Sequence, residues 1–175
     1  VAIIENEGGE AVVPDLIGFM NYSLFNQIWK ADELNMSQKS KRLAKLGIDA
    51  INLLEKPINK ALEKSVRFEG IESIYDIAKG AEKVVSIGNH TGEGWFLTGE
   101  MIELLNNGVK NIVCLQPFGC LPNHIVGKGM LKELRRQFKG ANISPIDYDP
   151  GSSEVNQLNR IRLMMTTAKK MQKAN

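Results

Sequence analysis

The feature that most constrains the fold is an alternation of short apolar runs with helix-length segments in the second half of the chain. Three such runs are predicted strands: Val84–Ile87, Ile112–Leu115 and Ile143–Asp147. Helices are predicted after them at about 93–106, up to about Phe138, and from Ser153 to about Lys170. Strands that alternate with helices through short connections predict right-handed βαβ units and a parallel sheet.

The first half of the chain has a different residue pattern. Val1–Asn6 is a short β-branched run before Gly8-Gly9 and is predicted as a strand, whereas residues 15–80 are predicted as a helical insert. Asp15, and either Ser37 or Ser40, are suitable N-caps for two helices, and a short helix is predicted over Glu72–Lys79. The second of these helices is predicted to bury an apolar stripe and to kink or break near Pro57. The residues of that stripe are Leu43, Leu46, Ile48, Ile51 and Leu54.

These patterns predict the α/β class, with a Rossmann-like (flavodoxin-like) three-layer half at 84–175 and a helical insert after the first strand. We expect residues 1–175 to form a single domain. Because the chain opens on Val-Ala-Ile-Ile without an initiator Met, we also expect it to be a fragment of a larger protein.

Composition narrows the function classes. No run reaches the roughly 18 apolar residues of a membrane span, so a membrane is not expected as a partner. The net charge is only +2, and a nucleic acid is not expected as a partner either. Two cysteines in 175 residues give no disulfide framework and favour a cytoplasmic location. From residue 121 onward ten Lys/Arg face four Asp/Glu, a balance of +6 that could attract phosphates or an acidic partner, or could be a solvated helix face.

Three polar, glycine-containing loops follow the predicted strands, at 88–95, 116–129 and 147–153. Ligands of open parallel sheets bind beyond the carboxyl ends of the strands, where helix N-termini offer free N–H groups. We therefore expect a substrate site there, formed by residues of these loops and of the last helix. The candidates are Asn89, Glu93, Trp95, Asn123, His124, Lys128 and Asn156. Trp95 could equally begin an apolar helix face that packs on the sheet.

Other chemistries fit these loops less well. Lys128 is followed by Gly129 rather than Ser or Thr, so no phosphate loop is present. His90, His124 and Cys120 match no zinc-ligand spacing, and Cys120 with His124 is a weak nucleophilic pair. Cys114 lies within a predicted strand and is expected to be a buried, inert thiol, whereas Cys120 lies just past the strand end and is expected to be accessible.

The segment Asn111-Ile-Val-Cys-Leu-Gln-Pro-Phe-Gly-Cys-Leu-Pro-Asn-His124 resembles the C-terminal region of large CoA-substrate-specific enzyme activases and activase-related acyl-CoA dehydratases. Gly92-Glu-Gly-Trp-Phe-Leu-Thr98, Lys132-Glu-Leu-Arg-Arg136, Ile146-Asp-Tyr-Asp149 and Glu154-Val-Asn-Gln-Leu-Asn-Arg160 belong to the same resemblance. These proteins are similar in turn to the 2-hydroxyglutaryl-CoA dehydratase D component and to benzoyl-CoA reductase subunits. The resemblance covers about residues 84–165.

The resemblance implies a 2-hydroxyacyl-CoA dehydratase-like domain with an acyl-CoA-type substrate, in which Cys120 is one thiolate ligand of a four-iron, four-sulfur (4Fe-4S) cluster. Since the chain has no further plausible cysteine ligand, it implies that other domains of the same polypeptide complete the site. The isolated chain is then expected to bind no iron and to lack ATPase and dehydratase activity. The alternative is a non-catalytic interaction or scaffold domain that binds an anionic ligand or a partner domain.

Overall fold

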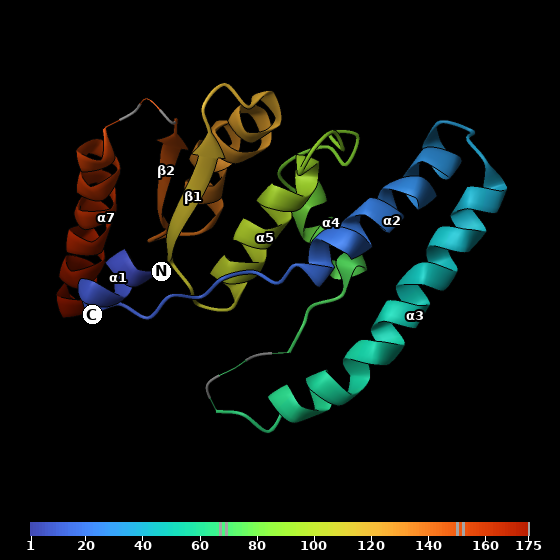
Figure 1. Ribbon diagram of the computed structural model, residues 1–175, viewed down its shortest axis with the longest axis horizontal. Helices are drawn as coiled ribbons and strands as arrows, with labels where there is room; N and C mark the ends of the chain where they lie inside the picture. The colour runs from blue at the N-terminus through green and yellow to red at the C-terminus, as the bar shows by residue number, and fades with distance from the viewer. Residues whose placement is uncertain (67, 69, 150, 152, 175) are drawn as a thin grey trace. The chain divides into compact units, whose positions relative to one another are not determined.

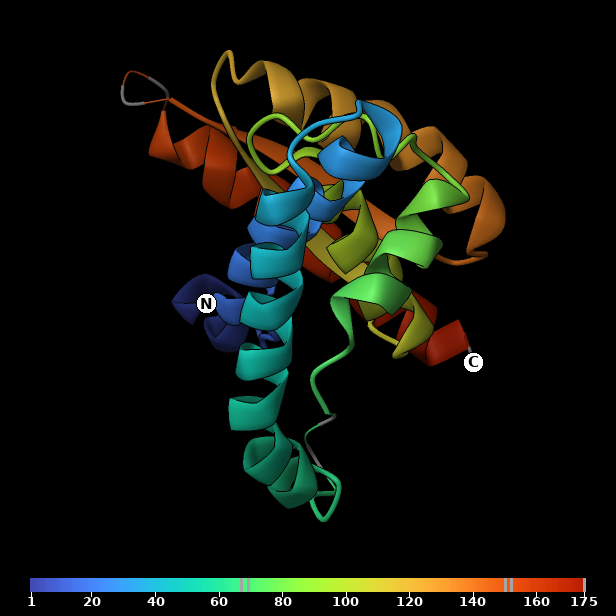
Figure 2. The same cartoon turned by 90° about the vertical axis from the view of Figure 1, so that its right-hand side faces the viewer.

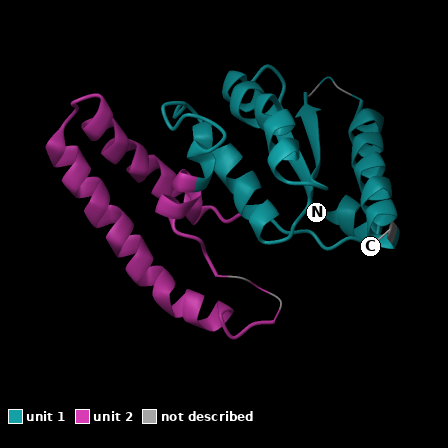
Figure 3. Cartoon of the chain, turned by 180° about the vertical axis from the view of Figure 1, so that it is seen from behind, with its two compact units in different colours: residues 1–13, 80–175 teal, residues 14–79 magenta. Residues whose placement is uncertain are grey.

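The computed structural model describes residues 1–66, 68, 70–149, 151 and 153–174. The chain divides into two compact units, which Figure 3 shows in separate colours. Unit 1 consists of Val1–Val13 and Gly80–Asn175, and unit 2 consists of Pro14–Lys79. Within the described residues no helix combines the length and the apolar character needed to cross a membrane.

Unit 1 is built around two parallel strands, β1 (Asn111–Pro117) and β2 (Asn142–Tyr148). Ile112 pairs with Ile143, and Gln116 pairs with Asp147. The strands are connected through the π-helix η1 (Asn123–Gly127), the 3-10 helix η2 (Lys128–Met130) and α6 (Leu131–Gln137). The predictions of these two strands and of their parallel, helix-linked arrangement are confirmed.

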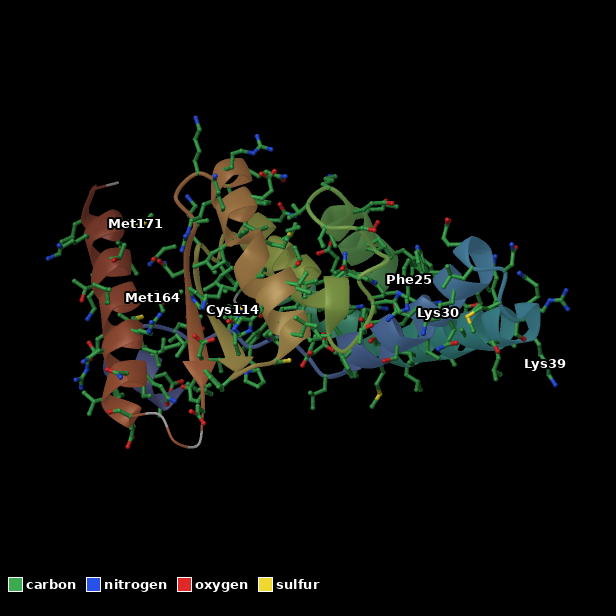
Figure 4. The ribbon with its side chains drawn as sticks, turned by 90° about the horizontal axis from the view of Figure 1, so that it is seen from above. Phe25, Lys30, Lys39, Cys114, Met164 and Met171 are labelled. Carbon is green, nitrogen blue, oxygen red and sulfur yellow. The ribbon has the colours of Figure 1, made fainter. Side chains whose placement is uncertain are left out.

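Helices pack on both faces of this pair of strands because alternate residues of β1 point in opposite directions. On one face Ile112 and Cys114 pack with buried side chains of α5 (Gly94–Asn106) and α6. On the other face Val113 packs with Ile146 and with α7 (Glu154–Ala174). Figure 1 shows α7 and α5 on opposite sides of the strands, and Met164 points from α7 towards them in Figure 4. Unit 1 is therefore of the mixed α/β class.

Two predicted strands are wrong. The segment Val1–Asn6 forms a short helix, α1 (Ala2–Asn6), whose Ile3 and Ile4 pack against the cluster formed by α7 and β2. Val84–Ile87 forms turns instead: the N–H groups of Val84 and Val85 both donate to the carbonyl of Ala81, at 2.9 and 2.8 Å. Val85 and Ile87 are nonetheless buried. A short apolar run thus marks burial here, and burial alone does not select a strand.

Unit 2 contains two long antiparallel helices, α2 (Ile17–Glu33) and α3 (Gln38–Leu62), which lie side by side in Figures 1 and 2. The Asp15 carboxylate accepts from the N–H of Gly18 (2.7 Å), and the Ser37 hydroxyl accepts from the N–H of Ser40 (3.3 Å). Ser37, one of the two predicted caps, therefore starts α3. Asp15 lies one residue before the cap position of α2, which is Leu16, although its carboxylate still accepts from Gly18. The predicted short helix is α4 (Ile74–Glu82), which runs three residues beyond Lys79.

The predicted buried stripe of α3 is wrong in part. Ile48 is buried, but Leu43, Leu46 and Leu54 are exposed, and Ala44 and Glu55 are buried in their place. The helix also continues through Pro57 to Leu62 rather than ending before it. The close side of α3 carries small residues: a Cβ added at Gly47 would lie 3.0 Å from the side chain of Leu24 on α2. Small residues allow the two helices to approach, so the larger leucines point elsewhere.

The two-sided packing of unit 1 predicts that Ile146→Ala destabilises the protein. Ile146 is fully buried between β2 and α7, so the change should lower the free energy of unfolding by about 2–5 kcal/mol. Urea denaturation measures this. Leu163→Ala, at an exposed position of α7, is the matched control and should cost less than about 1 kcal/mol. Equal effects of the two substitutions would contradict the packing of α7 on β2.

Candidate active site at the strand ends

The parallel strands bring two of the polar loops to one edge. The N–H of Phe118, one residue after β1, donates to the carbonyl of Tyr148, the last residue of β2 (2.8 Å). The loops that follow the two strands therefore start next to each other. Pro150 and Ser152 of the third loop lie outside the described residues.

Cys120 lies just before the helical segment that begins at Leu121, and its side chain is half-buried. Gly119 precedes it with φ +71°, a conformation that side chains rarely adopt, so the turn that presents the thiol depends on this glycine. The side-chain amide of Asn123 donates to Cys120 Sγ (3.0 Å). A hydrogen bond of this kind stabilises negative charge on sulfur.

Asn123 connects the second loop to the first. Its Nδ2 also lies 3.4 Å from Oε2 of Glu93, which immediately precedes α5. Asn123 is 3% exposed, so it acts as a buried link between the Cys120 thiol and the Glu93 carboxylate. The first loop thus reaches this edge through Glu93, although no strand precedes it.

Gln116 holds Asn123 in place and was not among the residues singled out from the sequence. Its Nε2 donates to the carbonyl of Asn123 (3.0 Å), and its side chain is fully buried. Gly127 at the end of η1 fits against it, since an added Cβ would lie 3.0 Å from Gln116 Nε2. A polar residue at an inward-facing position of β1 was the available sequence signal. A π-helical turn such as η1 is a frequent feature of functional sites.

His124 does not form a pair with the thiol. Its Nδ1 donates to the carbonyl oxygen of Cys120 (3.0 Å), and its backbone N–H donates to the same oxygen (3.1 Å). The imidazole therefore fixes the backbone of Cys120, and the side chain in contact with Sγ is Asn123. In this arrangement the histidine is not positioned as a base for the cysteine.

Lys128 extends the site towards β2. Its ammonium lies 3.6 Å from Oδ2 of Asp147, and about half of its side chain is exposed. Asp147 Oδ1 is buried and makes no hydrogen bond with the described residues. The Lys128–Asp147 pair thus places a cation with accessible surface at the strand edge, where it can attract an anionic group.

The remaining candidate residues contact groups other than Cys120. Asn89 shapes the first loop: its Nδ2 donates to the carbonyl of Ser86 (3.1 Å), and its carbonyl accepts from the N–H of Trp95 (2.7 Å). Trp95 is 0% exposed and packs edge-on against Phe96, so the structure supports its reading as a core side chain. Asn156 lines a shallow hollow of about 360 Å³ on α7. The other lining residues of that hollow are Asn159, Arg160 and Leu163.

The described residues contain no group of three or more His, Cys, Asp or Glu side chains arranged to hold a metal ion. Cys114 is not a second accessible thiolate, because it is 4% exposed and burial raises its pKa to about 11, a rise that a hydrogen bond from Gln116 only partly offsets. The edge therefore offers a single accessible thiol, that of Cys120, together with the carboxylates of Glu93 and Asp147 and the ammonium of Lys128.

Comparison with known proteins identifies no relative of the chain. Neither a protein-family model, nor a curated protein, nor a solved structure matches it. A function for the chain is therefore inferred from the contacts at the strand edge, around Cys120, Asn123 and Lys128.

The difference between the two thiols is directly testable. At pH 8 a maleimide reagent should modify Cys120 of the native protein rapidly and Cys114 slowly, since only the thiolate reacts and Cys114 is buried with a raised pKa. Mass spectrometry of the digested protein locates the label. The Cys120→Ser variant should remain nearly unlabelled until it is unfolded in urea. Faster modification of Cys114 than of Cys120 in the native protein would refute this assignment.

Proposed function

We propose that the chain is a dehydratase-like domain in which Cys120 supplies one thiolate ligand to a 4Fe-4S cluster. The observation that carries this proposal is the placement of Cys120 Sγ: half-buried, beyond the carboxyl end of β1, and hydrogen-bonded by Asn123. Thiolates suit iron–sulfur ligation because they are soft, charged donors, and hydrogen bonds to sulfur tune such clusters.

The described residues can supply one ligand of such a cluster and not all of its ligands. A cubane cluster needs several thiolates, whereas Cys114 is buried with a raised pKa and the described residues contain no group of three or more metal-ligating side chains. We therefore assign the remaining ligands to other domains of the same polypeptide. When bound, the cluster would supply one-electron transfer. The residues of this chain would orient Cys120 through Asn123 and Gln116 and would hold its backbone through His124.

The same proposal includes a Rossmann-like (flavodoxin-like) three-layer fold for 84–175. Its support is the parallel pairing of β1 and β2 with helices packed on both faces. In folds of this kind the ligand lies beyond the carboxyl ends of the strands, and in unit 1 this is the edge that carries Cys120, Asn123 and Lys128.

For the substrate we propose an acyl-CoA-type thioester. Its phosphate groups are anionic, and the accessible ammonium of Lys128, within a C-terminal third of charge +6, favours their approach. Glu93 is the exposed carboxylate of the site and lies next to Asn123. A cytoplasmic location, where both free cysteines stay reduced, belongs to this proposal.

The second candidate is a non-catalytic domain that binds an anionic ligand or a partner domain. It is favoured by the hollow on α7, where Arg160 stands beside Asn156 and Asn159. A guanidinium flanked by amide side chains can bind a phosphate or a carboxylate without any reaction. In this case Cys120 would have no metal-binding role.

Anaerobic iron–sulfur reconstitution of the polypeptide that contains this chain separates the two candidates. The first predicts cluster absorption in the visible range that is lost or strongly reduced in Cys120→Ser and retained in Cys114→Ser, the matched control. Equal iron content in wild type and Cys120→Ser would favour the second candidate.

The ligand count gives a separate prediction for residues 1–175 alone. Purified without oxygen, this chain should fold but contain well below one cluster per chain, because a single accessible thiolate cannot hold one against loss to chelators. Iron and sulfide analysis measures this. Stoichiometric iron and sulfide would instead show that the chain binds a cluster by itself, or shares one between two copies of Cys120.

A further inference from the structure

The helical hairpin of unit 2 exposes large apolar side chains along both of its helices. We define its apolar face by eight residues that are each at least 44% exposed. Leu16 immediately precedes α2, and Phe19 and Met20 lie in its first turn. Five belong to α3, namely Leu43, Leu46, Leu53, Leu54 and Ile58.

The α3 members form one stripe. At 100° per residue, Leu43, Leu46 and Leu54 fall within a sector of about 80°, and Leu53 and Ile58 flank it on either side. Between these flanks the other residues from 43 to 58 are Gly47, Ala50 and Pro57. The stripe therefore contains no charged residue along four turns of helix.

The exposed residues of α2 lie on the same side of the hairpin. The two helices contact each other near Leu24 and Gly47. Relative to Leu24 on α2, Met20 is rotated by about 40° and Phe19 by about 140°. Relative to Gly47 on α3, Leu54, Leu43 and Leu46 are rotated by about 20°, 40° and 100° in the same sense. Since the helices run antiparallel, rotations in the same sense bring both sets of side chains to one side of the pair. The eight residues thus form a continuous surface.

This surface is large for a monomer. With about 100 Å² for each exposed side chain, it amounts to on the order of 800 Å², above the few hundred Å² of ordinary surface patches and equal to one partner's share of a standard interface. In a two-helix hairpin, moreover, each helix packs against the other along one side. Two such hairpins placed face to face form a four-helix bundle, which buries the apolar sides of both.

From this area and this lack of charge we infer that the apolar face of α2 and α3 pairs with the same face of a second copy of the chain, giving a symmetric dimer. An uncharged apolar surface is complementary to itself, as a two-fold interface requires. This inference is independent of the function proposed for Cys120, which lies in unit 1.

The charges of α3 are compatible with a polar rim around such an interface. Four basic residues, Arg42, Lys45, Lys56 and Lys60, lie on one flank of the stripe, accompanied by Asp49. Because both copies carry these cations, repulsion between the rims should weaken the dimer at low ionic strength. Raising the salt concentration should therefore strengthen association, the reverse of what an acidic partner or an anionic membrane would show.

Sedimentation velocity of the 175-residue chain between about 2 and 200 µM tests the inference. We expect a monomer–dimer equilibrium that Leu46→Glu combined with Leu53→Glu weakens by about 100-fold or more, because two apolar contacts are replaced by carboxylates. These side chains are exposed, so far-ultraviolet circular dichroism of the variant should match wild type. Leu163→Glu, at an equally exposed position on α7, should leave the dimer intact.

Three outcomes would overturn the inference: a wild-type chain that stays monomeric at 200 µM, a dimer unaffected by the double substitution, or open-ended assemblies. A separate experiment tests membrane binding with vesicles of phosphatidylcholine that contain about 30% phosphatidylserine. Co-sedimentation of the wild-type monomer with these vesicles, abolished by the double substitution and by high salt, would assign the apolar face to an anionic membrane instead.

Discussion

The parallel pairing of β1 with β2 is the constraint on which the rest of unit 1 depends. Because the two strands run in the same direction, Pro117 and Tyr148 end at one edge, and the loops that follow them are joined by a hydrogen bond from Phe118. The pairing also presents two apolar faces, one covered by α5 and α6 and the other by α7. An antiparallel pair would send these two loops to opposite ends and would separate Lys128 from Asp147.

The polar chain from Gln116 through Asn123 to Cys120 is the second constraint on the site. The buried side-chain amide of Gln116 on β1 donates to the backbone carbonyl of Asn123. The side-chain amide of Asn123 in turn donates to the sulfur of Cys120. Gln116 Nε2 and Asn123 Nδ2 donate these two hydrogen bonds, whereas Gln116 Oε1 is buried without a partner among the described residues. The two donated bonds orient the thiol more firmly than a surface loop could. A ligand that binds at this edge therefore meets a cysteine whose orientation is already set.

Much of unit 1 could be predicted from sequence because its signals are local. β1, β2, α5 and α7 each coincide with a run of the right length bounded by a turn. Val84–Ile87 and Val1–Asn6 could not be assigned in the same way, since four to six apolar residues indicate burial without specifying a pairing partner. The leucines of α3 misled for a related reason. They form a clear stripe, but Ala44 and Ile48 are the buried residues, and Gly47 is the one that lies against Leu24 of α2.

The candidate site likewise combines residues that the sequence could place with residues that it could not. The loop position of Cys120 follows from the order of elements. The expectation for Glu93 rests on a strand at 84–87 that does not form, and Glu93 reaches the edge through Asn123 instead. The role of Gln116 depends on a tertiary contact with Asn123 that no spacing reveals. The measurement that tests the proposed role of Cys120 most directly is anomalous diffraction at the iron edge from anaerobic crystals of the polypeptide that contains this chain. We predict iron bonded to Cys120 Sγ, with Asn123 still donating to that sulfur. A cluster held entirely by other residues, with Cys120 free of iron, would contradict the proposal.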